Sequence, residues 1–173
     1  MALISSRTIL TSLSLFHITL GFFFLTNPVS VADQALVYVL GEVVGMPHSR
    51  AFDAPSPALA FLGVVLATVG ISDLVSLSLP EEVCMVHYWG TQAPVRVLLA
   101  VAAVLYSFFG PSPARPKDVR RAAYMGGTLQ NRVFFAYMFT EAISWCWLWV
   151  TLREERAQLQ ARKASRRRSQ VYQ

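Results

Sequence analysis

The sequence predicts an all-α, polytopic membrane protein with four transmembrane helices, and three observations lead to this fold class. Hydrophobic residues make up 54% of the chain and charged residues only 14%, whereas soluble domains average about 25% charged residues. Four apolar stretches each approach the roughly 20 residues that a helix needs to cross the hydrocarbon core of a bilayer. They cover residues 8–26, 58–79, 93–110 and 133–152. Each stretch also carries an ionisable residue, which is rare inside a membrane and marks a candidate functional position.

The first predicted span, residues 8–26, ends at Asn27-Pro28, because proline disfavours helical geometry in the residue before it. Arg7, the apolar run and the small residues Ser30-Val31-Ala32 also resemble a secretory signal with a cleavage site. The apolar run is longer than the usual signal core of about 7–15 residues. We therefore expect the first span to be retained as a transmembrane helix.

A further helix is predicted between the first two spans, over Val31–Met46. Its apolar residues fall near one side, which is typical of a helix lying in the membrane interface. A helix packed against the bundle fits the same pattern equally well, so both arrangements stay open. The second span, residues 58–79, follows a proline-rich connection and stops at Leu79-Pro80.

The third span, residues 93–110, follows the cluster His87-Tyr88-Trp89, which we place at the headgroup level where amphipathic rings concentrate. The fourth span, residues 133–152, is predicted to carry a second aromatic belt near its far end, formed by Trp145, Trp147 and Trp149. The four spans make up a transmembrane domain over residues 1–155. A basic, helical C-terminal tail follows over residues 156–173.

Small and polar residues recur at steps of three and four on one stripe of every span. Such stripes let helix backbones approach and hydrogen-bond where lipid provides no hydrophobic gain. We therefore expect them to face inward and to pack the four helices together. The stripes are Arg7, Thr11, Ser14, His17 and Gly21; Ala60, Gly63, Ala67, Gly70 and Asp73; Arg96, Ala100, Ala103 and Ser107; and Tyr137, Glu141, Ser144 and Thr151.

Two charge pairs follow from the depth of the ionisable residues. Asp73 lies near the end of the second span and Arg96 near the start of the third, so both lie toward one membrane surface. An unpaired Asp or Arg in mid-membrane costs about 2.5–3.5 kcal/mol, so an ion pair is predicted. His17 and Glu141 lie near the middle of their spans and can meet if those helices are neighbours. Each pair can be a structural clasp or part of a functional pathway.

The tail concentrates basic residues and is predicted to contact anionic lipid, since such segments gain about 1 kcal/mol per Lys or Arg near the membrane. A solvated helix end is the alternative. Serines beside the cluster, Ser165 and Ser169, also suggest a switch in which phosphorylation weakens lipid attachment. The candidate lipid contacts are Arg162, Lys163, Arg166, Arg167 and Arg168.

The orientation follows from basic residues near the membrane. With four spans both termini share one side, which carries eight basic residues against six on the other. The positive-inside rule therefore predicts cytosolic termini by a small margin. A fourth segment that re-entered the membrane instead of crossing it would remove the conflict between the basic loop and the basic tail.

No enzyme motif is found in the sequence. It has no glycine-rich phosphate loop, no zinc-protease helix and no nucleophile elbow. Cys84 and Cys146 belong to no metal-binding spacing and are expected to be structural. We therefore expect no catalytic residue, no cofactor and no metal.

Four short motifs, taken in order, resemble the fungal "increased loss of mitochondrial DNA" protein family. The motifs are Asp73-Leu74, Pro94-Val95-Arg96-Val97-Leu98, Glu141 and Arg153-Glu154-Glu155. The resemblance covers about Thr8 to Glu155. It implies a small four-span protein of the endoplasmic reticulum membrane in a fungus, with a genetic link to maintenance of the mitochondrial genome. The basic tail differs from the often acidic tails that we expect in the family.

The leading functional hypothesis is therefore a non-enzymatic scaffold or complex subunit that supports mitochondrial DNA maintenance indirectly. Its expected partners are membrane lipids and either another membrane protein or further copies of itself, without direct nucleic-acid binding. One alternative is a small ion channel or transporter subunit that uses Glu141. The other is a lipid-handling membrane enzyme.

Overall fold

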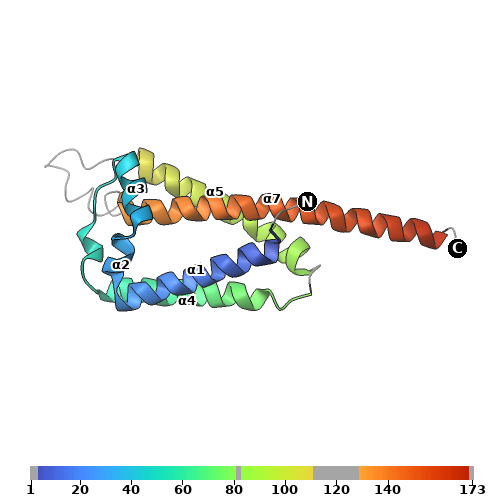
Figure 1. Cartoon of the computed structure of the whole chain (residues 1–173), viewed down its shortest axis with the longest axis horizontal. Helices are drawn as coiled ribbons and strands as arrows, with labels where there is room; N and C mark the ends of the chain where they lie inside the picture. The colour runs from blue at the N-terminus through green and yellow to red at the C-terminus, as the bar shows by residue number, and fades with distance from the viewer. Residues whose placement is uncertain (1–3, 81–82, 111–128, 172–173) are drawn as a thin grey trace.

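The computed structural model describes residues 4–80, 83–110 and 129–171, and over these residues the chain is helical with no strand. Four of the described helices are long and apolar enough to cross a membrane (Figure 1). They are α1 (Ser6–Thr26), α4 (Pro57–Ser76), α5 (Trp89–Phe109) with the π-helix η2 (Val83–Tyr88) leading into it, and α7 (Arg132–Val171). The predicted all-α, four-span fold class is confirmed.

The helices form two antiparallel pairs, α1 with α4 and α5 with α7, which make the two most extensive packing interfaces of the described chain. Backbones touch in the first pair: a Cβ built on Gly63 would come within 2.7 Å of the Gly21 carbonyl oxygen, and one on Gly21 within 2.6 Å of the Gly63 oxygen. Gly70 approaches the Ser14 carbonyl oxygen in the same way. The small-residue stripes predicted for the first two spans therefore face each other.

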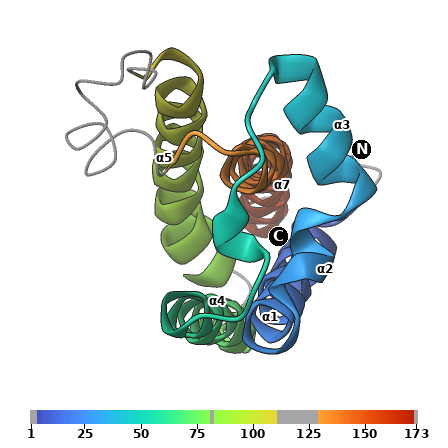
Figure 2. The same ribbon diagram turned by 90° about the vertical axis from the view of Figure 1, so that its left-hand side faces the viewer.

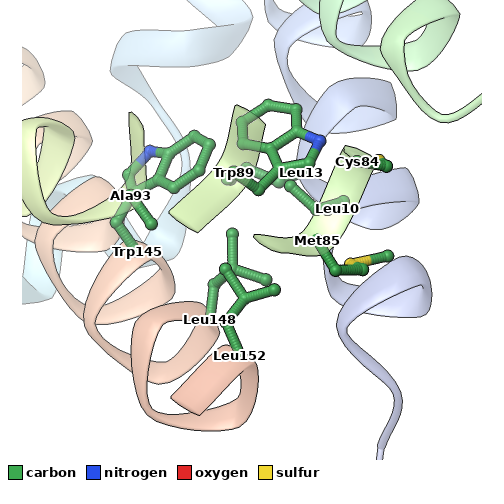
Figure 3. Packing of buried hydrophobic residues seen from close by; sticks show 9 residues of the cluster. All are labelled: Leu10, Leu13, Cys84, Met85, Trp89, Ala93, Trp145, Leu148 and Leu152. Atoms are coloured by element: carbon green, nitrogen blue, oxygen red, sulfur yellow. The ribbon is translucent and has the colours of Figure 1, made fainter. Parts of the chain in front are cut away.

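An aromatic and aliphatic cluster packs the second pair together and also packs it against α1, which contributes Leu10 and Leu13 (Figure 3). The indole rings of Trp89 and Trp145 stack with centroids 5.6 Å apart, and both side chains are fully buried. The sequence predicts both tryptophans in aromatic belts at the headgroup level, whereas the structure buries both rings between helices, so neither is a lipid-facing member of such a belt. Trp147 is 52% exposed and stays compatible with the predicted belt. The stack is buried because η2 turns Trp89 inward onto α7.

Two short helices connect α1 to α4. The predicted helix over Val31–Met46 is divided into α2 (Pro28–Ala32) and α3 (Ala35–Val44). α3 packs against the start of α7, where Gly41 lies directly against the Arg132 side chain (Figure 2). Arg132 also donates to the Met46 carbonyl oxygen at 2.8 Å and pairs with Glu42 at 3.1 Å. The structure thus favours a helix packed on the bundle.

Several predicted span ends move. Serine side chains cap α1 at Ser5 and α4 at Ser56, where each accepts a backbone N–H of the first turn. α4 ends at Ser76, three residues before the predicted Leu79. α5 begins at Trp89, upstream of the predicted residue 93, and Pro94 lies inside this helix. α7 does not stop at residue 152 but continues as one helix into the tail. The basic loop segment 115–121 lies outside the described residues.

Candidate functional site

The pair Asp73–Arg96 joins α4 to α5 through two parallel hydrogen bonds. The Arg96 Nη1 and Nη2 atoms donate to the two Asp73 carboxylate oxygens at 2.6 and 2.9 Å. The Asp73 side chain is 4% exposed and the Arg96 side chain 25%. Such bidentate, charge-assisted pairs are among the strongest hydrogen-bonded contacts and they fix the orientation of both partners.

The same guanidinium lies over the tryptophan stack of the second helix pair. Its Cζ atom is 4.6 Å from the ring centroid of Trp145 and 5.3 Å from that of Trp89. Cation–π contacts of this kind contribute about 0.5–2 kcal/mol, more when water is excluded. Arg96 therefore neutralises Asp73 while it packs on α7.

The second predicted pair, His17–Glu141, joins α1 to α7. The His17 Nε2 atom lies 2.8 Å from Glu141 Oε1, and the Trp145 indole N–H donates to Glu141 Oε2 at 2.6 Å. Both His17 and Glu141 are buried. Each carboxylate oxygen is thus engaged by one ring nitrogen.

These contacts form a single network that crosses between the two helix pairs. Trp145 connects its halves, because the ring stacks under Arg96 while its N–H binds Glu141. Tyr137 adds an edge-on contact to the His17 ring, with centroids 6.3 Å apart. We call Asp73, Arg96, Trp145, Glu141 and His17 the intramembrane network. The role of Trp145 in this network could not be predicted from the sequence, where the residue looks like an interfacial tryptophan.

A second polar cluster, at the end of the bundle where α7 leaves it, was not predicted. The Glu155 carboxylate accepts the Ser6 backbone N–H at 2.9 Å and the Ser6 hydroxyl at 2.5 Å, so it caps the first turn of α1 from another helix. Arg156 donates through Nε to the Met85 carbonyl oxygen of η2 at 3.3 Å. We call Ser6, Met85, Glu155 and Arg156 the neck. Its only signal in the sequence was the motif Arg153-Glu154-Glu155.

An apolar groove follows the seam between α1 and α7. It consists of two cavities, of about 260 and 360 Å³, and Phe16 and Thr140 line both. The first reaches Val31 and Val37, and the second reaches Ile4 near the start of α1. Apart from Gln34, the side chains around the groove are aliphatic, aromatic or hydroxyl-bearing, which suits an acyl chain better than a polar solute.

The five predicted lipid contacts of the tail lie on the last turns of α7 by their backbone. Their side chains, those of Arg162, Lys163, Arg166, Arg167 and Arg168, lie outside the described part of the structure. They are separate from the intramembrane network and from the neck.

Comparison with known families adds an assignment to this geometry. Residues 4–162 match the family described as increased loss of mitochondrial DNA protein 1, Ilm1. The chain belongs to this family. The match covers the four spans, the intramembrane network and the neck, but it stops at the first basic residue of the tail cluster. No curated protein and no solved structure matches the chain.

The family assignment confirms the resemblance drawn from the four motifs, and each of the four motifs supplies an observed contact. Asp73 and Arg96 bind each other, Glu141 binds His17 and Trp145, and Glu155 binds Ser6. Family membership links the chain to mitochondrial DNA maintenance. The motifs therefore lie where the Ilm1 fold is held together.

Proposed function

We propose that this Ilm1-family protein is a non-enzymatic scaffold or complex subunit of the endoplasmic reticulum membrane that supports mitochondrial DNA maintenance indirectly. Direct contact with DNA is not required, because lipid supply, ion balance or contact between organelles can each connect the two membranes. The termini are proposed to face the cytosol.

One observation carries the proposal: every carboxylate oxygen of the intramembrane network is engaged by a partner within it, and the one buried atom of the network without a partner among the described residues is the His17 Nδ1. Asp73 and Arg96 form a bidentate pair, and both oxygens of Glu141 are engaged by ring nitrogens. A proton carrier or catalytic base needs a carboxylate that can reach a substrate or water. Carboxylates occupied in this way suit a clasp that keeps four helices in one arrangement.

The outer surface supports a role in assembly. Large apolar side chains on α4 and α5 face outward, among them Phe61 at 72%, Leu98 at 70% and Phe109 at 75% exposure. Lipid covers such a surface in a monomer, and a second membrane protein can replace the lipid without burying a charge. Small shape differences then decide which partner packs there.

Affinity purification tests the proposal. The protein is tagged, extracted in a mild detergent and recovered from a strain in which the tagged copy maintains mitochondrial DNA. We expect another membrane protein, or further copies of the chain, in stoichiometric amount. The variant F61A/L98A, which leaves the intramembrane network intact, should lose the partner and should raise the fraction of cells without mitochondrial DNA.

The same preparation identifies the result that would contradict the proposal. A protein recovered alone, together with a variant F61A/L98A and a second outward variant F109A that both maintain mitochondrial DNA, would exclude an assembly role for these faces. Lipid analysis of a deletion strain tests the enzyme alternative. Loss of one lipid species together with accumulation of its precursor would favour a lipid-modifying enzyme over a scaffold.

A second candidate function, binding a membrane lipid, is favoured by the groove between α1 and α7. Its lining is mostly apolar, and the Tyr137 ring stands in its wall. Mass spectrometry of the protein purified from native membranes should then find one lipid class in excess over the bulk. Substitution of Thr140, which lines both cavities, by Phe places a bulky ring where they meet and should weaken binding of that lipid, whereas an unchanged lipid content would exclude the groove as a site.

A further inference from the structure

The whole net charge of this protein lies in its last 17 residues. The chain carries a formal charge of +5, from 15 basic and 10 acidic residues. Residues 157–173 hold five of the basic residues and none of the acidic ones, so residues 1–156 balance to zero. The tail is therefore a concentrated cation on an otherwise neutral molecule.

The fold holds this charge away from the membrane that the protein spans. α7 is a single helix of 40 residues, which corresponds to about 60 Å at the usual rise per residue. A bilayer's hydrocarbon core takes up only about 30 Å of this length. The rest of α7 projects beyond the end of the bundle, free of the other helices (Figure 1).

Distances along the helix decide what the basic residues can reach. The apolar part of α7 ends at Leu152, and the headgroup layer adds about 6 Å, or about four residues. Arg162 then lies about 9 Å above that layer and Arg168 about 18 Å above it. The Debye length at physiological ionic strength is about 8 Å, so the surface potential of the protein's own membrane falls to about a third at the height of Arg162 and to about a tenth at that of Arg168.

The neck fixes the direction in which the helix leaves the bundle. Glu155 binds the first turn of α1, and Arg156 binds η2 directly above Gly90, where a side chain would overlap the guanidinium. Two contacts on successive residues, made to two different helices, prevent α7 from bending at this level. The basic cluster is thus held upright.

We propose that the tail binds the anionic lipid surface of a second, apposed membrane. The helix would act as a short rod that joins the membrane it spans to another, with Arg162, Lys163, Arg166, Arg167 and Arg168 as the contact. This inference goes beyond the scaffold role and stands on the tail alone, so it survives a failure of the purification experiment.

The composition of the tail favours lipid over a protein partner. Protein interfaces depend on a few buried anchors, most often Trp, Tyr or Arg, and an arginine anchor is usually surrounded by side chains that exclude water. Residues 161–170 read Ala-Arg-Lys-Ala-Ser-Arg-Arg-Arg-Ser-Gln and contain no aromatic residue and no aliphatic one larger than alanine. An anionic membrane needs no such anchor, because clusters of four to eight basic residues bind it by charge alone.

The test uses the full chain in lipid nanodiscs of neutral phosphatidylcholine, mixed with separate vesicles that contain phosphatidylserine. Co-flotation measures binding to the second membrane. We expect binding to the anionic vesicles and none to neutral ones. The variant R166Q/R167Q should weaken binding roughly twentyfold, because each basic residue contributes about a fivefold factor near an anionic surface.

Two further measurements separate the apposed membrane from the protein's own. A dye attached after Gln173 should show little quenching by quencher lipids placed in the protein's own nanodisc, even when that nanodisc is anionic. A matched variant keeps all five charges but carries Gly-Gly-Ser-Gly inserted after Gln158, which makes the rod flexible. This variant should fold back onto an anionic nanodisc and become strongly quenched.

Several results would overturn the proposal. Strong quenching of the unaltered protein would show that the tail lies on its own membrane. Vesicle binding that survives replacement of all five basic residues by glutamine would assign the contact to another surface. Tighter binding to an RNA oligomer or to polyglutamate than to the vesicles would make the partner a different macromolecule.

Discussion

Glu141 accepts hydrogen bonds from a histidine of α1 and a tryptophan of its own helix, and these two contacts determine what a substitution costs. His17 and Trp145 are buried as well, and the two rings cover both oxygens of the carboxylate. The Glu141 carboxylate is therefore the hydrogen-bond acceptor for both the His17 and the Trp145 ring.

Substitution by glutamine tests this role. Glu141→Gln keeps an oxygen for the Trp145 N–H, and its amide N–H can donate to His17 Nε2 once the imidazole proton moves to Nδ1, so we expect the free energy of unfolding to fall by only about 1 kcal/mol. Glu141→Leu leaves two buried polar groups without partners and should cost about 3 kcal/mol. Unfolding in mixed micelles measures both.

The same pair of variants distinguishes the clasp from an ion pathway. If Glu141→Gln is as abundant as the unaltered protein but no longer maintains mitochondrial DNA, the carboxylate itself is functional. Conduction in planar bilayers that disappears in this variant would point to the channel alternative.

Arg96 is the other residue whose chemistry is specific. Lysine at this position keeps the charge but lacks the planar fork and the stacking surface that Asp73, Trp89 and Trp145 contact. We expect Arg96→Lys to lower the free energy of unfolding by about 2 kcal/mol. Arg7→Lys, which changes one exposed hydrogen bond to the Leu77 carbonyl oxygen, should have almost no effect, and equal losses in the two variants would contradict the account.

At this scale, sequence reasoning found both charge pairs from depth and charge alone. It did not find Trp145, because a tryptophan near the end of an apolar stretch is normally interfacial. It also missed Ser6 and Glu155, which are 149 positions apart and meet only because α1 starts where α7 leaves the bundle.

Among the elements, α1 and α4 depend on glycine for their close approach. Gly63→Ala places a methyl group against the Gly21 carbonyl oxygen, so the helices must separate. Overpacking of this kind costs about 1–3 kcal/mol, and we expect a loss of about 2 kcal/mol in micelle unfolding. Val64→Ala, on the outward side of the same turn, serves as the control and should change stability by less than about 0.5 kcal/mol.

The neck gives a prediction for the start of α1. Glu155→Gln weakens the acceptor for the Ser6 N–H and removes a negative charge from a helix N-terminus, where such a charge stabilises the helix. Amide hydrogen exchange in the first turn of α1 should become about five- to tenfold faster, while exchange in α5 stays unchanged. Uniform acceleration over the whole bundle would mean that the neck acts globally.

The sequence predicted that the four transmembrane helices exist, but it predicted where they end and which helices they pack against only in part. Apolar length and proline positions located the four spans, and the small residues showed which faces point inward. They do not show which stripe meets which, since any two glycine-bearing stripes could pair. The helical continuation into the tail was predicted from the sequence, whereas the division of the connecting helix at Asp33 and Gln34 needed the packed structure.

For the whole molecule, the arrangement is two tightly packed helix pairs joined across their seam by the intramembrane network. α4 meets α5 mainly at Asp73 and Arg96, and the groove along α1 and α7 leaves the other side of the seam loosely filled. In lipid, where apolar contacts between helices provide little driving force, these charges determine how the pairs sit together. The central claim is that the network couples the two pairs.

A double-mutant cycle between Asp73 and Arg96, measured by unfolding of the protein in bicelles, tests this claim most directly. Asp73→Asn and Arg96→Gln should each destabilise the protein, while the double variant should lose at least about 1.5 kcal/mol less than the two single losses together. Losses that add to within about 0.5 kcal/mol would show that the two side chains act independently, and the account of a charge-coupled bundle would be wrong.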